Sequence, residues 1–186
     1  MRARAAKEQF ELVPGVQYSY LYDSQSDTYE IDGVEVFAAG KWNGDDYTDE
    51  DLRAICEADA ELHDLIRPRV GVEHKDGPAW GWMGPLRMLG EKIIADLKRI
   101  PKWLFESVQA GRYANQSVEM RLNYEHPETK KRYPMVIDSL KFLGIHPPAI
   151  PTLKPVAAFD AARQTIELYR GERPGVQGAS TSEQAD

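Results

Sequence analysis

One histidine and one serine are of the right types to perform acyl transfer together. His74 closes a short apolar segment at 70–74, and Ser117 lies in an alternating segment at 116–124. A serine hydroxyl is a weak nucleophile until a neighbouring base takes its proton, and a neutral imidazole can accept that proton at neutral pH. We therefore take His74 as the candidate general base and Ser117 as the candidate nucleophile.

Each of these residues also has a plain structural interpretation. A histidine at the end of a strand commonly bonds to backbone or water, and a serine on the polar face of a strand commonly meets solvent. No Gly-x-Ser-x-Gly pattern surrounds Ser117, so the sequence does not predict a nucleophile elbow. The pair together indicates catalysis more strongly than either residue alone.

A third group normally orients the imidazole of such a pair. Asp138 is our first candidate, because it is an acid inside an otherwise apolar segment, where a carboxylate is costly unless it is paired or exposed. His146 and Glu119 are the alternatives. Each of the three is equally compatible with an ordinary surface role.

The residue types give no support to metal or cofactor chemistry. The four histidines are His63, His74, His126 and His146, and no two of them have the spacing of a short zinc motif. Cys56 is the single cysteine, which excludes an intrachain disulfide and indicates a small buried hydrophobe. We expect neither a metal nor a cofactor.

Composition limits the class of protein. A chain of 186 residues with 42% hydrophobic residues is suited to one good core rather than two full domains. A formal net charge of −7 argues against a general binder of nucleic acid or anionic membranes. No apolar run approaches the roughly 18 residues that span a bilayer, and no signal-peptide core follows the N-terminal charges. We expect a soluble cytoplasmic protein.

Periodicity and turn residues predict the elements that must position the candidate pair. Strands are expected at 10–13, 16–22 and 29–38, the last with a turn at Asp32-Gly33, followed by a polar loop at 41–46. Thr48 is expected to cap a helix running to about residue 66, with Asp51 completing the cap. A second helix is expected at about 101–110, between a hairpin around Gly90 and strands at 116–124 and 133–143.

These elements predict an α+β fold, a closed or nearly closed and mostly antiparallel β-barrel flanked by two helices. The domain is expected to span residues 1–155. Residues 156–186 are expected to form a C-terminal helix near 157–169 and a disordered tail from 170, because the tail is rich in glycine, serine and glutamine.

Several short motifs, taken in order, carry a resemblance to a known family. They are Val-Glu-His-Lys-Asp at 72–76, Ala-Trp-Gly-Trp-Met-Gly-Pro-Leu at 79–86, Gln-Ser-Val-Glu at 116–119 and Leu-Gly-Ile-His-Pro-Pro-Ala at 143–149. Over about residues 30–153 the chain resembles the head maturation proteases of tailed bacteriophages. It is most similar to the protease and scaffold protein of Mu-like phages.

The resemblance implies a serine endopeptidase that cleaves scaffold and itself during prohead maturation. It implies a small β-barrel related to herpesvirus assemblin, with the family histidine at His74 and the family serine at Ser117. The family's acid falls near Ser139 to Lys141, where this chain has no acid, so Asp138 is the nearest match; assemblin-type enzymes use a second histidine, which keeps His146 as an alternative.

The resemblance also implies where the protein works and with what. The expected partners are phage scaffold and major capsid proteins, inside the assembling prohead in the cytoplasm of the bacterial host, and a homo-oligomer is left open. Two other functions fit the sequence: a non-catalytic scaffold or capsid-binding module on the same fold, and an unrelated small enzyme or ligand-binding barrel.

Overall fold

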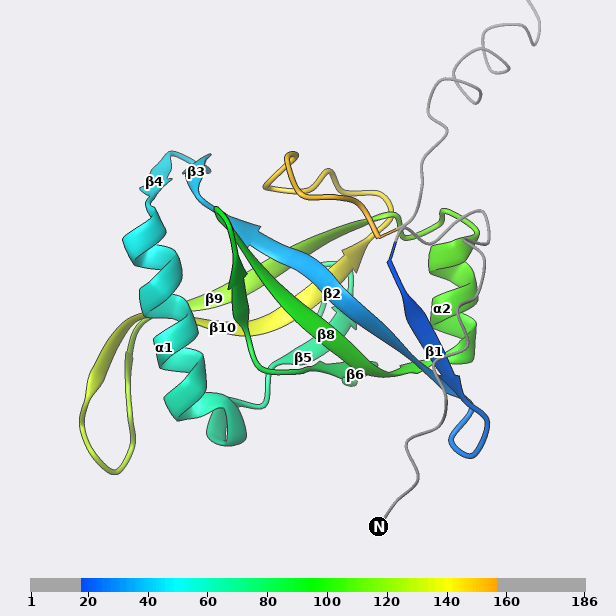
Figure 1. The fold of residues 1–186 in the computed structure, drawn as a ribbon, viewed down its shortest axis with the longest axis horizontal. Helices are drawn as coiled ribbons and strands as arrows, with labels where there is room; N and C mark the ends of the chain where they lie inside the picture. Colours follow the sequence, from blue (N-terminus) through cyan, green and yellow to red (C-terminus); the bar gives the residue numbers. More distant parts are fainter. Residues whose placement is uncertain (1–17, 157–186) are drawn as a thin grey trace, which may run out of the picture.

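The computed structural model describes residues 18–156, which form one large sheet, a small hairpin and two helices (Figure 1). The strands are β1 Tyr20–Asp23, β2 Thr28–Ala38, β3 Gly40–Trp42, β4 Asp45–Tyr47, β5 Arg69–Val72, β6 Gly81–Met83, β7 Arg87–Leu89, β8 Lys92–Pro101, β9 Asn115–Glu125 and β10 Arg132–Leu143. The helices are α1 Asp49–Ile66 and α2 Lys102–Gln109.

The large sheet has eight strands in the order β1-β2-β8-β6-β5-β10-β9, with β7 paired to β8 beside this path. All pairs in it are antiparallel except β5 with β10, which is parallel. The expectation of an α+β fold with a mostly antiparallel sheet is therefore confirmed. The one parallel pair matters for the site, because it places the end of β5 beside the end of β10.

The expectation of a closed barrel is wrong, because no backbone ladder joins β2 to β9 within residues 18–156. β1 pairs with β2, and the segment that follows β10 fills the gap between β2 and β9. The Gln116 side-chain amide donates to the Glu35 carbonyl oxygen at 2.8 Å and to the Lys154 carbonyl oxygen at 2.9 Å. Side chains and a loop thus connect the two sides, and the sheet stays open.

Helix α1 begins as the sequence predicts. The Asp51 backbone N–H donates to the Thr48 hydroxyl oxygen, and the Thr48 N–H donates to the Asp51 carboxylate at 2.7 Å, which completes the capping box. The helix ends at Arg67, whose left-handed φ of 51° lets its N–H reach back to the His63 carbonyl. Leu62 packs with Tyr133 and Val136 of β10, so the helix supports the strand at the centre of the site.

Helix α2 lies at the other end of the sheet from α1 (Figure 1). It follows Pro101 directly, as expected for a proline at a helix start. Leu104, Phe105 and Val108 are buried, and the Phe105 ring stacks on Tyr29 of β2 at 3.8 Å between centroids. The helix therefore anchors the N-terminal hairpin to the strand that precedes it.

Two local predictions in the first half of the chain are wrong. Asp32-Gly33 is not a turn: β2 runs through it, and the positive φ of Gly33 marks a shift in the register with β8. The segment 41–46 is not a plain loop: it forms the β3–β4 hairpin, turned by Asn43 and Gly44, both at positive φ. An Asn-Gly pair is the usual signal for this hairpin turn.

Three predicted segments lie outside the described residues. They are the strand at 10–13 and the two parts of the predicted C-terminal region, the helix at 157–169 and the tail from 170. Among residues 18–156 there is no helix with the length and hydropathy needed to span a membrane.

Candidate functional site

The chain turns sharply just before His74. Glu73, the residue between β5 and His74, is buried and has a left-handed φ of 53°, which is rare for a residue other than glycine, asparagine or aspartate. Its N–H donates to the Phe142 carbonyl at the end of β10. This bond fixes the turn and therefore the point from which the His74 side chain leaves the sheet.

The Glu73 carboxylate holds a second loop against the same turn. One oxygen accepts hydrogen bonds from the N–H groups of Gly144 and Ile145, at 2.9 and 3.1 Å, and the other pairs with His146 Nδ1 at 2.9 Å. Burial alone raises the pKa of Glu73, but the bonds from His146 and the two N–H groups outweigh it and place the pKa below its usual value of 4.5. Glu73 is therefore an ionised clamp between the loops after β5 and β10.

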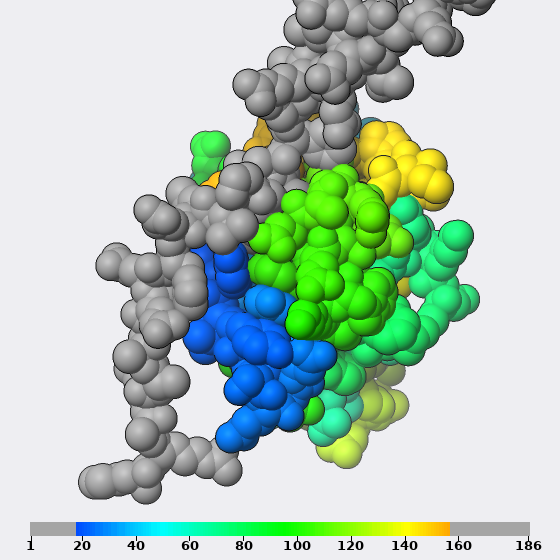
Figure 2. All heavy atoms as spheres, turned by 90° about the vertical axis from the view of Figure 1, so that its right-hand side faces the viewer, coloured from blue at the N-terminus to red at the C-terminus, as the bar shows by residue number. Residues whose placement is uncertain are grey.

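These two loops lie on the face that contains α2. In Figure 2 the green helix α2 lies between β1, in blue, and the teal and yellow segments that follow β5 and β10. Ile145 is 89% exposed on the yellow loop, and His74 is exposed at the start of the teal one. The site is thus open to solvent on this side of the molecule.

His74 pairs with Glu119, not with Asp138. The distance from His74 Nδ1 to Glu119 Oε1 is 3.1 Å, and about two-fifths of each side chain is exposed. Glu119 was an alternative in the sequence, and it is the carboxylate that the fold brings to the ring. A carboxylate in this position orients the imidazole and stabilises its protonated form.

The other oxygen of Glu119 has two further partners. Ser139 Oγ donates to Oε2 at 2.7 Å, and Lys141 Nζ lies 3.5 Å from the same oxygen. Burial raises the pKa of Glu119, but the hydrogen bonds from Ser139 and His74 and the charge of Lys141 lower it below its usual value. Because Glu119 is then an ionised acceptor at neutral pH, His74 Nδ1 carries the proton toward it and Nε2 is the free acceptor.

Ser117 lies two residues before Glu119 on β9, so both side chains leave the same face of the strand. Its backbone position is directly opposite Lys141 on β10, as Glu119 is opposite Ser139. Ser117 is 7% exposed, and its hydroxyl makes no hydrogen bond to His74 or to any other group among residues 18–156. Nucleophile–base bonds are often long before substrate binds, so the free hydroxyl is compatible with the candidate role.

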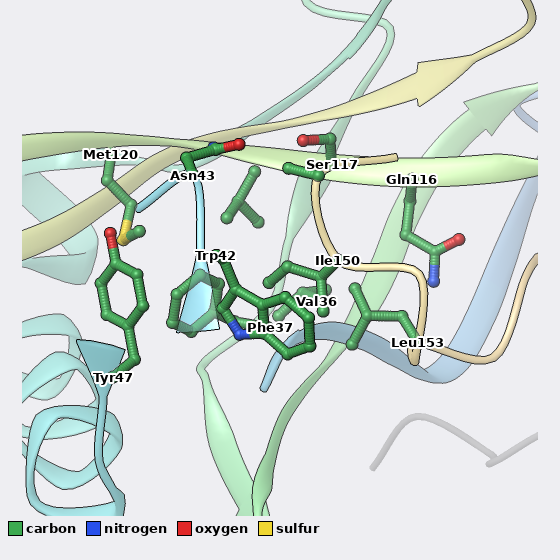
Figure 3. Close-up of a pocket in the computed structure, with 12 residues that line it drawn as sticks. Val36, Phe37, Trp42, Asn43, Tyr47, Gln116, Ser117, Met120, Ile150 and Leu153 are labelled. Atoms are coloured by element: carbon green, nitrogen blue, oxygen red, sulfur yellow. The ribbon is translucent and has the colours of Figure 1, made fainter. Parts of the chain in front are cut away.

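Two hollows adjoin these residues. One of about 60 Å³ lies beside Ser117, and most of the residues that line it are apolar, Phe37, Trp42 and Ile150 among them. Figure 3 shows Ser117 at its rim, with the hydroxyl on the side of β9 away from Phe37 and Ile150. A polar one of about 140 Å³ is lined by Glu119, Lys141 and the loop after His74. The nucleophile candidate therefore has a hollow lined mostly by apolar residues on one side and a charged hollow nearby.

Asp138, our first candidate for the third group, has other partners. It accepts from Arg69 Nη2 at 2.9 Å and from Arg121 Nε and Nη2 at 3.0 and 2.7 Å. Its position in β10 is an irregular one, because the register with β9 shifts between Ile137 and Ser139. That bulge turns Asp138 toward the two arginines. The sequence argument that such an acid needs a partner holds, but the partners are the arginines.

The remaining histidines have structural partners. His146 pairs with Glu73, as described, and His63 Nδ1 lies 3.0 Å from the buried Asp59 carboxylate on α1. His126 Nδ1 accepts hydrogen bonds from the N–H groups of Glu128 and Thr129 in the β9–β10 turn.

Within the described part of the chain no group of three or more His, Cys, Asp and Glu side chains is arranged to hold a metal ion.

Sequence reasoning missed Ser139 and Lys141. Both face Glu119 only because the bulge at Asp138 resets the alternation of β10. The sequence shows a serine and a lysine at alternate positions of an apolar segment. It does not show the register of β9 with β10, which places Ser139 opposite Glu119 and Lys141 opposite Ser117. The protein thus assembles His74, Ser139 and Lys141 around the Glu119 carboxylate, with Ser117 beside it.

Comparison with family models, with characterised proteins and with solved structures gave no match for this chain.

Proposed function

We propose that this protein is a serine endopeptidase of the phage head maturation type, with Ser117 as nucleophile, His74 as general base and Glu119 as the group that orients the base. The observation that carries the proposal is the hydrogen-bonded pair of His74 and Glu119. Glu119 lies on β9, two residues after Ser117. The order of sequence motifs from 72 to 149 and the mostly antiparallel sheet also support it.

The chemistry follows from the orientation of the ring. Nε2 of His74 takes the Ser117 proton as Oγ attacks a peptide carbonyl carbon, and the protonated ring then donates to the leaving amine as the C–N bond breaks. Water hydrolyses the resulting acyl-enzyme by the reverse sequence of proton transfers. Glu119 keeps its charge throughout and stabilises the imidazolium that forms between these steps.

A fluorophosphonate probe tests the proposed nucleophile. We expect the purified protein to be labelled at Ser117, with labelling lost in Ser117→Ala and strongly reduced in His74→Ala. Ser26→Ala, which removes an exposed hydroxyl in the β1–β2 turn, serves as the matched control and should be labelled like the wild type. Peptide mass spectrometry locates the adduct.

The alternative function is a non-catalytic scaffold or capsid-binding module on the same fold. A folded wild-type protein that takes no label at Ser117 supports that alternative and contradicts the peptidase. Self-cleavage is tested by intact mass: loss of a terminal fragment in the wild type, but not in Ser117→Ala, supports processing of the chain by itself. Co-expression with phage scaffold and capsid genes extends the same comparison to its proposed substrates.

A further inference from the structure

Lys141 is unlike the other paired lysines of the β9–β10 region. Its side chain is 13% exposed, whereas those of Lys130 and Lys131, in and beside the β9–β10 turn, are 69% and 53% exposed. Lysines are seldom held this far from solvent, because ordering the side chain costs conformational entropy and desolvating the ammonium costs more. A lysine side chain covered to this extent beside a candidate active site therefore needs an explanation.

The fold makes room for this side chain at Gly71. Lys141 is paired with Gly71 on β5 and with Ser117 on β9, so the three residues form one row across the sheet. A Cβ atom at Gly71 would lie 3.0 Å from Lys141 Cδ and 3.1 Å from Nζ. A side chain at position 71 would therefore require the end of the lysine side chain to give by a few tenths of an ångström. The glycine in the strand is thus the slot in which Lys141 lies.

The ammonium joins two parts of the site. Nζ donates to the Lys75 carbonyl oxygen at 3.3 Å, in the residue after His74, and forms an ion pair with Glu119 Oε2 at 3.5 Å. Since Ser139 also donates to Oε2, that oxygen is fully engaged and Oε1 is left for His74. The carboxylate cannot rotate without losing one of these contacts.

We infer that Lys141 is a positioning residue of this site. Its side chain lies over Gly71, and its ammonium fixes the Glu119 carboxylate and the backbone that carries His74. The same ammonium weakens the electrostatic attraction between Glu119 and the protonated ring. The catalytic meaning of this inference rests on the proposed function. A fully ionised and unshared Glu119 would favour the imidazolium, which is no base. Sharing its charge with Lys141 lets Glu119 orient the ring while attracting the ring proton less strongly.

NMR titration of the His74 ring tests the inference in the substrate-free protein. Lys141→Met keeps the length and packing of the side chain and removes the charge. We expect the midpoint of the His74 titration to move to higher pH by about 0.5 unit or more. The Lys141 ammonium no longer repels the protonated ring, and it no longer offsets the negative charge of Glu119. Lys141→Gln, which is uncharged and polar, gives the same measurement should Lys141→Met fold poorly.

Two further variants separate positioning from a general charge effect. Gly71→Ala leaves every charge in place but requires the end of the Lys141 side chain to give by a few tenths of an ångström, and we expect a smaller movement of the midpoint in the same direction. Lys131→Met removes an exposed ammonium that pairs with Glu61, away from this site, and should leave the midpoint unchanged.

A His74 midpoint that stays within error of the wild type in a folded Lys141 variant overturns the inference, even where Ser117 is labelled by the fluorophosphonate. Conversely, a midpoint that moves in a protein whose Ser117 takes no label retains Lys141 as the residue that positions Glu119 and contradicts the proposed function alone.

Discussion

The side chain of Gln116 bonds to the backbone of Glu35 at the place where a closed barrel would have had a strand pair. Its Nε2 donates to the carbonyl oxygens of both Glu35 and Lys154, while its Oε1 is buried without a partner among the described residues. One amide therefore ties β9, β2 and the segment after β10 together, immediately beside Ser117.

Replacing Gln116 should loosen this connection. In Gln116→Met two part-buried carbonyls lose their donor, although the unpartnered Oε1 is removed as well, so we expect a net loss of about 1–2 kcal/mol in the free energy of unfolding. Urea denaturation measures it. Gln25→Met, at an exposed turn position, should be neutral; a Gln116→Met protein as stable as this control would show that the connection contributes nothing.

The choice between Glu119 and Asp138 as the third group can be decided kinetically. Glu119→Gln should lower the rate of fluorophosphonate labelling at Ser117 by about 10²–10⁴-fold, because the ring loses the carboxylate that orients it. Asp138→Asn keeps the shape of the residue between its arginines and should label near the wild-type rate. The reverse order of the two rates would return the role to Asp138.

The clamp formed by Glu73 should make stability depend on pH in the acid range. Because folding lowers the pKa of Glu73, its contribution is complete above the usual value of 4.5 and is lost as the pH falls through the lower value of the folded state. Glu73→Gln should therefore be less stable than the wild type at neutral pH, and the difference should shrink as the pH falls below the usual pKa of 4.5. The exposed Glu91→Gln is the control, and parallel pH curves for the wild type and Glu73→Gln would contradict the clamp.

The capping box of α1 gives a prediction about stability alone. Thr48→Ala removes the acceptor of the Asp51 N–H and should cost about 1 kcal/mol, measured by thermal or urea unfolding. Thr152→Ala, at an exposed loop position, should cost nothing comparable. Labelling of Ser117 should be unchanged in both, since the cap lies outside the site.

Local signals in the sequence were sufficient where one short segment determines the outcome. Thr48 and Asp51 predicted the start of α1, and Gly90 predicted the β7–β8 hairpin, because caps and tight turns depend on a few neighbouring residues. Asn43-Gly44 was an equally local signal that was overlooked. Asp32-Gly33 shows the limit of such signals, since the same residue types occur in turns and in bulges.

The candidate site depended on information that no single segment contains. His74 and Ser117 could be proposed from residue type and resemblance, but the choice of Glu119 over Asp138 depends on how β9 and β10 are aligned. A bulge of one residue changes which side chains face one another, and nothing in either strand alone fixes it. The partners of Glu119 were unpredictable for the same reason.

The place of β10 in the sheet has a consequence for the timing of folding. β10 lies between β5, which leads to His74, and β9, which carries Ser117 and Glu119, yet among the strands of residues 18–156 it is the last to be synthesised. A nascent chain that ends before residue 132 has no strand with which to hold the two halves of the site in register. Contacts this distant in sequence form slowly, because the intervening chain must first be closed into a loop. The site is therefore assembled only once nearly the whole described chain has been synthesised.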